Sequence, residues 1–228
     1  HQFINANTIG TMNVALACSE YGVELVHTST SEVYGNAPAP QHEKTPASAL
    51  SPYAASKIGA DQIVQALSAS HGLDAGILRP FNTYGPRQSV RAVIPRIILR
   101  CQGPYAKTVE LGNLLPSRDF VYVSDTVAAF MAVAPSQLCE TFVAATGESI
   151  SIGDLALLIM SACGRHDMNI VDGFAARHDA AEVWNLRGDA SRLTKATGWV
   201  PRVDLDDGLG KTIEWFAARA AQLMPGMV

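Results

Sequence analysis

The sequence predicts an α/β protein, built on a parallel β-sheet with helices on both of its faces. Short apolar segments alternate with amphipathic stretches along the first 80 residues, as expected for strands joined by crossover helices. Two polar segments, residues 28–35 and 80–87, each follow a predicted strand. Because ligands of such sheets bind beyond the carboxyl ends of the strands, we expect both segments at one crevice.

The elements of the first half follow from hydrophobic spacing and turn residues. Apolar residues between Ile9 and Ala17 indicate one face of a helix, for which Gly22 is a natural stop. Pro52 favours the start of a second helix, since proline suits the first helical turn. The expected elements are a helix ending at 22, a strand at 23–27, a proline-rich loop at 38–46, a helix from 52 to about 72 and a strand at 75–78.

The second half continues the alternation. Pro95 is placed in the first turn of a helix, and Ser124 or Asp125 is expected to cap the next one. Ser151 or Asp154 starts a further helix. The expected elements are a helix at 93–101, strands at 109–111 and 120–123, a helix to about 134, a strand at 141–145, a helix to 163, a short helix opened by Asp189, a turn at 198–199 and a final helix at about 205–223.

Composition limits the function classes. The 228 residues carry a formal net charge of -4 and are 48% hydrophobic, so we expect neither a nucleic acid nor a membrane surface as partner. No apolar run reaches the ~18 residues of a membrane span. The cysteines form no Cys-x-x-Cys pair and the histidines show no ligand spacing, which predicts reduced thiols, a cytoplasmic protein and no metal site. The cysteines are Cys18, Cys101, Cys139 and Cys163.

The most informative pair of residues is Tyr53 and Lys57. Four residues apart on a helix, a phenol and an ammonium lie on one face, about one turn from each other. A free tyrosine has a pKa near ~10, and a neighbouring cation lowers it by favouring the phenolate. Tyr53 is therefore predicted to exchange a proton with a substrate alcohol, as oxidation of a hydroxyl to a ketone requires.

A second string, Ser29-Thr30-Ser31-Glu32-Val33-Tyr34-Gly35, places hydroxyls and a carboxylate after the first predicted strand. Once an alcohol is oxidised to a ketone, the hydrogen on the adjacent carbon becomes acidic, and a nearby carboxylate can remove it. Water can then leave from the next carbon, and the hydride taken in the oxidation can return there. Thr30, Glu32 and Tyr53 together supply the hydroxyl, the carboxylate and the phenol that this sequence of steps needs.

Several strings together resemble the extended short-chain dehydrogenases/reductases, the NAD-dependent epimerase/dehydratase family, and within it the nucleotide-sugar 4,6-dehydratases. Within that group, the strings are particularly similar to those of the UDP-N-acetylglucosamine 4,6-dehydratases of the legionaminic acid type. The resemblance implies a Rossmann-like doubly wound parallel sheet with a smaller α+β substrate-binding lobe. The matching strings are residues 7–11, 28–35, 53–57, 79–87, 86–95, 118–123 and 198–201.

The resemblance also implies roles for individual residues. Tyr53 is the base at O4, Thr30 hydrogen-bonds O4, and Glu32 takes the C5 proton. Lys57 binds the nicotinamide ribose and lowers the Tyr53 pKa. Residues implied at the NAD crevice are Asn7, Thr28, Tyr53, Lys57 and Pro80. Residues implied to bind the nucleotide-sugar substrate are Asn82, Arg87, Arg91 and Arg118, the last near its phosphates. The family implies a homodimer that packs through the Tyr-Lys helices.

Ser31, one of the residues implied to be catalytic, argues against a glucose-type dehydratase. Many glucose-type dehydratases have Asp at this position, as the acid that protonates the leaving O6, whereas Ser31 is a weak acid. UDP-glucuronate decarboxylases share the string around Ser31 and are the main alternative. Nucleotide-sugar 4-epimerases rank third, since they generally lack a carboxylate at the position of Glu32. Arg79 is interpreted as an ion-pairing residue and Asp119 as a structural residue. Glu182 fits a nucleotide-contacting position and a solvated face equally well.

No glycine-rich dinucleotide fingerprint occurs in the sequence, although an NAD enzyme needs one to hold the pyrophosphate. In the family it precedes the segment that corresponds to His1, so the chain is expected to lack the front of its cofactor domain. A fragment that binds sugar nucleotide without activity is the non-enzyme alternative. The expected division is residues 1–87 and 117–146 for the NAD-binding part, and 88–116 and 147–228 for the sugar-nucleotide lobe.

Overall fold

The computed structural model describes residues 1–103, 106–134, 140–172 and 182–223. Its central feature is a parallel sheet of three strands in the order β1-β2-β7: Leu25–Thr28, Ala75–Pro80 and Thr141–Ala144. Every residue of β2 except the last is buried, as expected for the middle strand of a parallel sheet covered on both faces. The parallel sheet predicted from the alternating pattern is confirmed, and it has the Rossmann-like form that the family resemblance implied.

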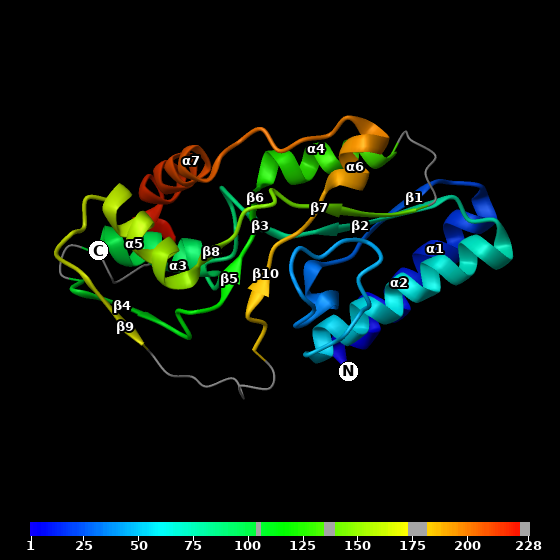
Figure 1. Cartoon of the computed structure of the whole chain (residues 1–228), viewed down its shortest axis with the longest axis horizontal. Coiled ribbons are helices and arrows are strands. Elements are labelled where there is room, and N and C mark those ends of the chain that lie inside the picture. Colours follow the sequence, from blue (N-terminus) through cyan, green and yellow to red (C-terminus); the bar gives the residue numbers. More distant parts are fainter. Residues whose placement is uncertain (104–105, 135–139, 173–181, 224–228) are drawn as a thin grey trace.

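Helices cover both faces of this sheet (Figure 1). On one side lie α1 (Gly10–Tyr21) and α2 (Pro52–His71), which pack against each other. On the other lie α4 (Val123–Val133) and α6 (Ser191–Thr197), which contact β2 and β7. A π-helical turn at Ile4–Ile9 precedes α1.

The remaining elements gather at the other end of the molecule (Figure 1). Three short pairings lead there: β3 with β6, β5 with β8 and β10, and β4 with β9. Helices α3, α5 and α7 share one apolar core with these strands. The bounds are β3 Asn82–Tyr84, α3 Val93–Gln102, β4 Thr108–Leu111, β5 Ser117–Arg118, β6 Phe120–Tyr122, β8 Ile150–Ser151, α5 Ile152–Ala162, β9 Asn169–Asp172, β10 Asn185–Leu186, α7 Leu205–Ala217 and α8 Ala220–Leu223.

The bounds of α2 agree with the sequence signals. Ser51 is its N-cap, and the Ser51 side chain accepts a hydrogen bond from the Ala54 amide at 3.0 Å. Pro52 opens the helix, and Gly72 ends it in the left-handed conformation at φ 67°, a conformation that glycine adopts without strain. This helix carries both Tyr53 and Lys57, so its well-defined start fixes where they lie.

Three expectations are wrong in detail. The apolar face predicted for the first helix is exposed: Ile9, Val14 and Leu16 expose 43%, 53% and 42% of their surface, and only Ala15 of α1 is buried. Tyr122 caps α4 without a side-chain bond. The Asp125 carboxylate instead accepts from the amides of Arg202 and Val203, each at 2.9 Å.

The predicted final helix is two helices, α7 and α8, separated by residues 218–219. The Arg219 guanidinium donates to the Trp215 carbonyl at 3.3 Å and lies over the Trp215 ring. A carbonyl freed at the end of α7 is thereby satisfied by a side chain.

Gly208 gives a test of how α7 packs. A Cβ at this position would lie 2.1 Å from the Tyr84 hydroxyl oxygen, so Gly208→Ala is expected to destabilise the protein by ~1–3 kcal/mol through overpacking. Gly210→Ala is the matched control on the same helix, because nothing lies within 4 Å of its added Cβ. That variant should gain up to ~1 kcal/mol from helix propensity. Chemical denaturation measures both, and equal effects would contradict this packing.

Candidate functional site

The candidate site lies at the carboxyl ends of β1 and β2, where the sequence predicted it. Thr28 and Pro80 are the last residues of these two adjacent strands. Thr30 follows β1 as the N-cap of a 3-10 turn, Ser31–Tyr34, and its hydroxyl accepts from the Glu32 amide at 3.2 Å. The turn holds Glu32 in a fixed place directly after the strand.

Tyr53 lies against this turn. Its phenol is near enough to the Thr30 hydroxyl and the Glu32 carboxylate for both to affect its pKa. Its ring makes an edge contact with Phe3, at 5.7 Å between centroids. The tyrosine predicted as a proton carrier, the hydroxyl and the carboxylate are therefore neighbours, although Glu32 and Tyr53 come from different elements.

The pKa of Tyr53 differs from the prediction. Burial raises it first and the Glu32 charge raises it further, while the Thr30 hydrogen bond lowers it, and the net pKa is raised. The sequence predicted that Lys57 lowers the pKa of Tyr53. The Lys57 ammonium instead turns to β1, where it donates to the Thr28 carbonyl at 2.8 Å. With this raised pKa, the Tyr53 phenol is protonated at neutral pH.

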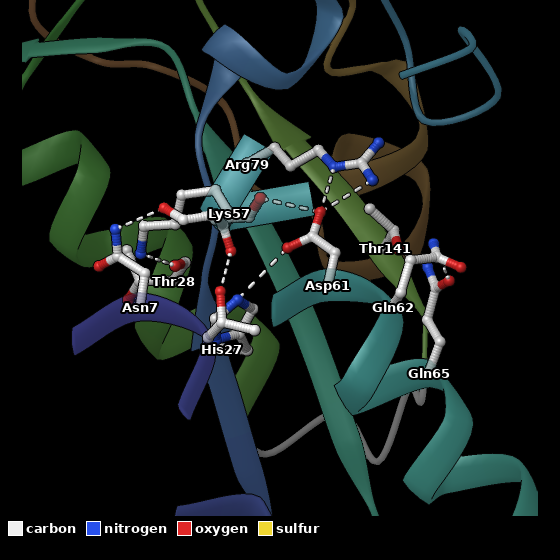
Figure 2. A network of polar contacts seen from close by, with 12 residues as sticks. Asn7, His27, Thr28, Lys57, Asp61, Gln62, Gln65, Arg79 and Thr141 are labelled. Atoms are coloured by element: carbon white, nitrogen blue, oxygen red, sulfur yellow. Dashed lines mark hydrogen bonds and ion pairs between the residues drawn. The ribbon is translucent and has the colours of Figure 1, made fainter. Parts of the chain in front are cut away.

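Lys57 is itself half-buried. Burial lowers its pKa, and the Asp61 carboxylate one turn further along α2 raises it. Asn7 reaches the same helix, where its amide donates to the Ser56 hydroxyl at 2.9 Å. Asn7, Thr28 and Lys57 lie together in Figure 2, so these three of the residues implied at the NAD crevice are brought together.

Glu32, Asn82 and Arg118 line one small cavity of about 40 Å³, together with Ser51. The remaining lining residues are Leu50, Ala54, Val183 and Leu186. The Asn82 side-chain oxygen is buried and has no hydrogen-bond partner.

Arg118 has a partner that the sequence interpretation did not identify. Its guanidinium lies 3.6 Å from the Glu182 carboxylate, and both side chains are largely buried. Glu182 therefore does not belong to a solvated face. Arg118 also borders a hollow of about 400 Å³ between β8 and residues 201–205, which contains none of the other predicted site residues.

Other predicted residues lie outside the cavity. Arg87 and Arg91 are exposed and do not line it, and Arg87 adopts a positive φ of 68°. Ser31 is 3% exposed and is likewise not among the lining residues. The substrate role that the resemblance implied for the two arginines stays a prediction.

Asp61 was missed altogether, and Ser51 was not considered for the site. Asp61 is 1% exposed and pairs with Arg79 at 2.9 Å, which confirms the ion-pairing interpretation of Arg79. The signal available in the sequence was its spacing, because a carboxylate four residues after Lys57 lies on the same helix face.

The described residues form neither a metal site nor a membrane-spanning helix. Across the described ranges, no three His, Cys, Asp or Glu side chains are grouped so as to hold a metal ion. No helix in the same ranges is both long and apolar enough to cross a membrane. The described cysteines Cys18, Cys101 and Cys163 are free thiols, and Cys139 lies outside the described residues.

Comparisons with known proteins agree with this geometry. The family model described as GDP-mannose 4,6 dehydratase matches residues 1–212. A dTDP-glucose 4,6-dehydratase of Streptomyces griseus is 32% identical over 222 residues, covering 94% of this chain and 65% of that protein. A UDP-glucose 4-epimerase of Mycolicibacterium smegmatis is 32% identical over 216 residues, covering 92% of this chain and 68% of that protein.

A solved structure matches closely in fold. DesIV, a dTDP-glucose 4,6-dehydratase from Streptomyces venezuelae solved with NAD bound, has a TM-score of 0.87 and 26% identity. The match covers 97% of this chain and 69% of DesIV. The chain thus spans about two thirds of the length of the relatives it matches. With the family model covering nearly the whole chain, the protein belongs to the GDP-mannose 4,6-dehydratase family.

Proposed function

We propose that this chain carries the catalytic groups of an NAD-dependent nucleotide-sugar 4,6-dehydratase, a hydro-lyase that forms a 4-keto-6-deoxy sugar. The observation that carries the proposal is the joint position of Tyr53, Thr30 and Glu32 beside the cavity that Asn82 and Arg118 line. Oxidation alone needs the tyrosine; elimination also needs a carboxylate within reach of C5. Both groups are present at one place.

The residues present fit the nicotinamide end of NAD. Lys57 has three N–H donors, and one is used on the Thr28 carbonyl. The others are available for ribose hydroxyls, beside Tyr53. A bound NAD would supply the hydride acceptor for oxidation at C4 and the hydride that returns to C6. We propose Asn7, Thr28 and Pro80 as further residues of this end of the cofactor site.

The chain's own groups perform the proton transfers. Tyr53 in its deprotonated form takes the O4 proton as the C4 alcohol is oxidised, and Thr30 orients O4 through its hydroxyl. Glu32 removes the C5 proton that the new ketone has acidified and passes it to the leaving C6 oxygen, so that water leaves from C6. Ser31 is a weak acid, which favours an acetylglucosamine-type substrate over a glucose-type one. Asn82 binds the sugar, and Arg118 binds a phosphate of the nucleotide in exchange for Glu182.

The alternatives differ in what Glu32 does. A 4-epimerase needs oxidation and return of the hydride at C4 but no C5 deprotonation, so it has no use for a carboxylate here. A UDP-glucuronate decarboxylase would lose carbon dioxide after the same oxidation. The position of Glu32 beside Tyr53 favours the dehydratase over the epimerase, and the release of carbon dioxide or of water from the substrate separates the decarboxylase from the dehydratase.

The substrate assay tests the proposal directly. The protein with NAD+ and UDP-N-acetylglucosamine is expected to give a 4-keto-6-deoxy product, detected by mass spectrometry as loss of one water. Glu32→Gln should lower product formation by ~10²–10⁴-fold, the usual contribution of a general base, while oxidation at C4 continues. Release of carbon dioxide from UDP-glucuronate, or full dehydration by Glu32→Gln, would contradict the assignment.

The Thr30 hydrogen bond predicts a pH effect. Tyr53 acts as a base only when deprotonated, so a higher pKa moves the acidic limb of kcat/KM to higher pH. Because the Thr30 contact lowers the Tyr53 pKa, Thr30→Val is expected to shift this limb upward. Tyr53→Phe is the control and should abolish turnover with the fold retained, as judged by circular dichroism. A limb that Thr30→Val leaves in place would contradict the proposed coupling.

The assembly and location are proposed on other grounds. We propose a homodimer that packs through α1 and α2, because the apolar residues Ile9, Met12 and Leu16 are exposed at the spacing of one helix face and α1 packs beside the Tyr-Lys helix. Light scattering should give twice the monomer mass, and a monomer across the micromolar range would contradict this. Free thiols at the described cysteines favour a cytoplasmic protein.

We also propose the division into two lobes. One apolar core joins α3, β4, α5 and α7, and separate clusters surround β1, β2 and β7. The proposed parts are a cofactor part at residues 1–87 and 117–146 and a sugar-nucleotide part at 88–116 and 147–228, of which α6 packs on β7 of the cofactor sheet.

A further inference from the structure

Behind the candidate site lies a buried polar network centred on Asp61 (Figure 2). One Asp61 oxygen accepts from the Arg79 guanidinium at 3.1 and 2.9 Å and from the Ser29 hydroxyl at 2.9 Å. His27 lies 3.3 Å from the other oxygen. The carboxylate on α2 thereby joins the ends of β1 and β2.

Arg79 extends the network to the turn that carries Glu32. Its third nitrogen donates to the Tyr34 hydroxyl at 3.2 Å, and the guanidinium lies over the Tyr34 ring at 5.2 Å. Tyr34 is fully buried and is the last residue of the Ser31–Tyr34 turn. Burial raises the pKa of Tyr34 to about 12, so it remains a neutral phenol.

The connection runs between the two groups that the reaction must keep together. Asp61 lies two helical turns after Tyr53, on the same helix, and Tyr34 lies two residues after Glu32 in the same turn. A guanidinium is a rigid planar fork, so its bonds to Asp61 and Tyr34 fix both elements in one geometry. Asp61, Arg79 and Tyr34 do not line the cavity of Glu32 and Asn82.

We propose that Arg79, held by Asp61, is a positioning residue that keeps the Glu32 turn in register with the Tyr53 helix through the Tyr34 hydroxyl. The inference rests on the proposed function, since it assigns the network to alignment of the elimination base relative to the oxidation site. Loss of the Tyr34 contact should displace Glu32 while Tyr53 and Lys57 stay in place, because the Asp61 pair is kept.

Tyr34→Phe tests this, because it removes one hydroxyl and keeps the ring that stacks on Phe81. Two partial reactions are measured with the nucleotide hexose: reduction of NAD+ in a single turnover, and deuterium incorporation at C5 from heavy water. We expect C5 exchange to fall by ~10-fold or more and reduction of NAD+ by less than ~3-fold, because misplacing a reacting group by ~1 Å costs up to ~10²-fold. Arg79→Lys, which keeps the charge but not the fork, should give the same imbalance.

Tyr84→Phe is the matched control. It removes an equally buried hydroxyl, which donates to the Leu205 carbonyl at 3.3 Å in the other core, and both partial rates should remain unchanged. Equal losses of both rates in Tyr34→Phe, or the same imbalance in Tyr84→Phe, would overturn the inference.

Hydrogen exchange gives a readout that does not depend on turnover. The amides of Gly35 and Ala37 donate to the Glu32 and Tyr34 carbonyls at 3.3 and 3.1 Å, so they report on the turn. Faster exchange there in Tyr34→Phe but not in Tyr84→Phe supports the coupling, and unchanged exchange overturns it. If the unmodified protein dehydrates no nucleotide hexose, the proposed function fails, and the exchange result alone decides the coupling.

Discussion

The pairing of the buried Asp61 carboxylate with the Arg79 guanidinium is the interaction on which the site depends. A charge at 1% exposure is strongly unfavourable unless it is paired and hydrogen-bonded. The chain meets this condition only when α2, β1 and β2 bring Asp61, Ser29 and Arg79 to one point. The energetic requirement of one buried charge therefore selects the arrangement that also places Tyr53 against Thr30.

A second buried carboxylate plays the same part at the opposite side of the cavity. Asp119 has no exposed surface and accepts from the amides of Thr146, Gly147 and Gly188. It thus joins the loop after β7 to the segment after β10, directly beside Arg118. Gly188 is required for this approach, since an added Cβ would lie 2.4 Å from the Ala145 side chain. The structural interpretation of Asp119 is confirmed by these bonds.

Much of the fold was readable from local signals, and the failures have a common cause. The bounds of α2 follow from Ser51, Pro52 and Gly72, residues that act within one turn of their own position. The exposure of the apolar residues of α1 was not predicted, because burial depends on segments far away in sequence. The N-cap of α4 was mispredicted for the same reason, since the partners of Asp125 are also distant in sequence. The carboxylate of Asp125 serves residues 202 and 203 and not its own helix.

For the candidate site, residue types and spacing were enough to select Tyr53, Lys57, Thr30 and Glu32, since their chemistry and their places after a strand or on a helix are local properties. The convergence of Glu32 and Asn82 on one cavity was expected in outline from the order of the strands, whereas Arg118 was expected there only from the family resemblance. Tertiary structure alone decided the Arg118–Glu182 pair, the Asp61–Arg79–Tyr34 network and the raised pKa of Tyr53. These features depend on burial and on the proximity of charged groups from distant segments, and both arise only when the chain folds.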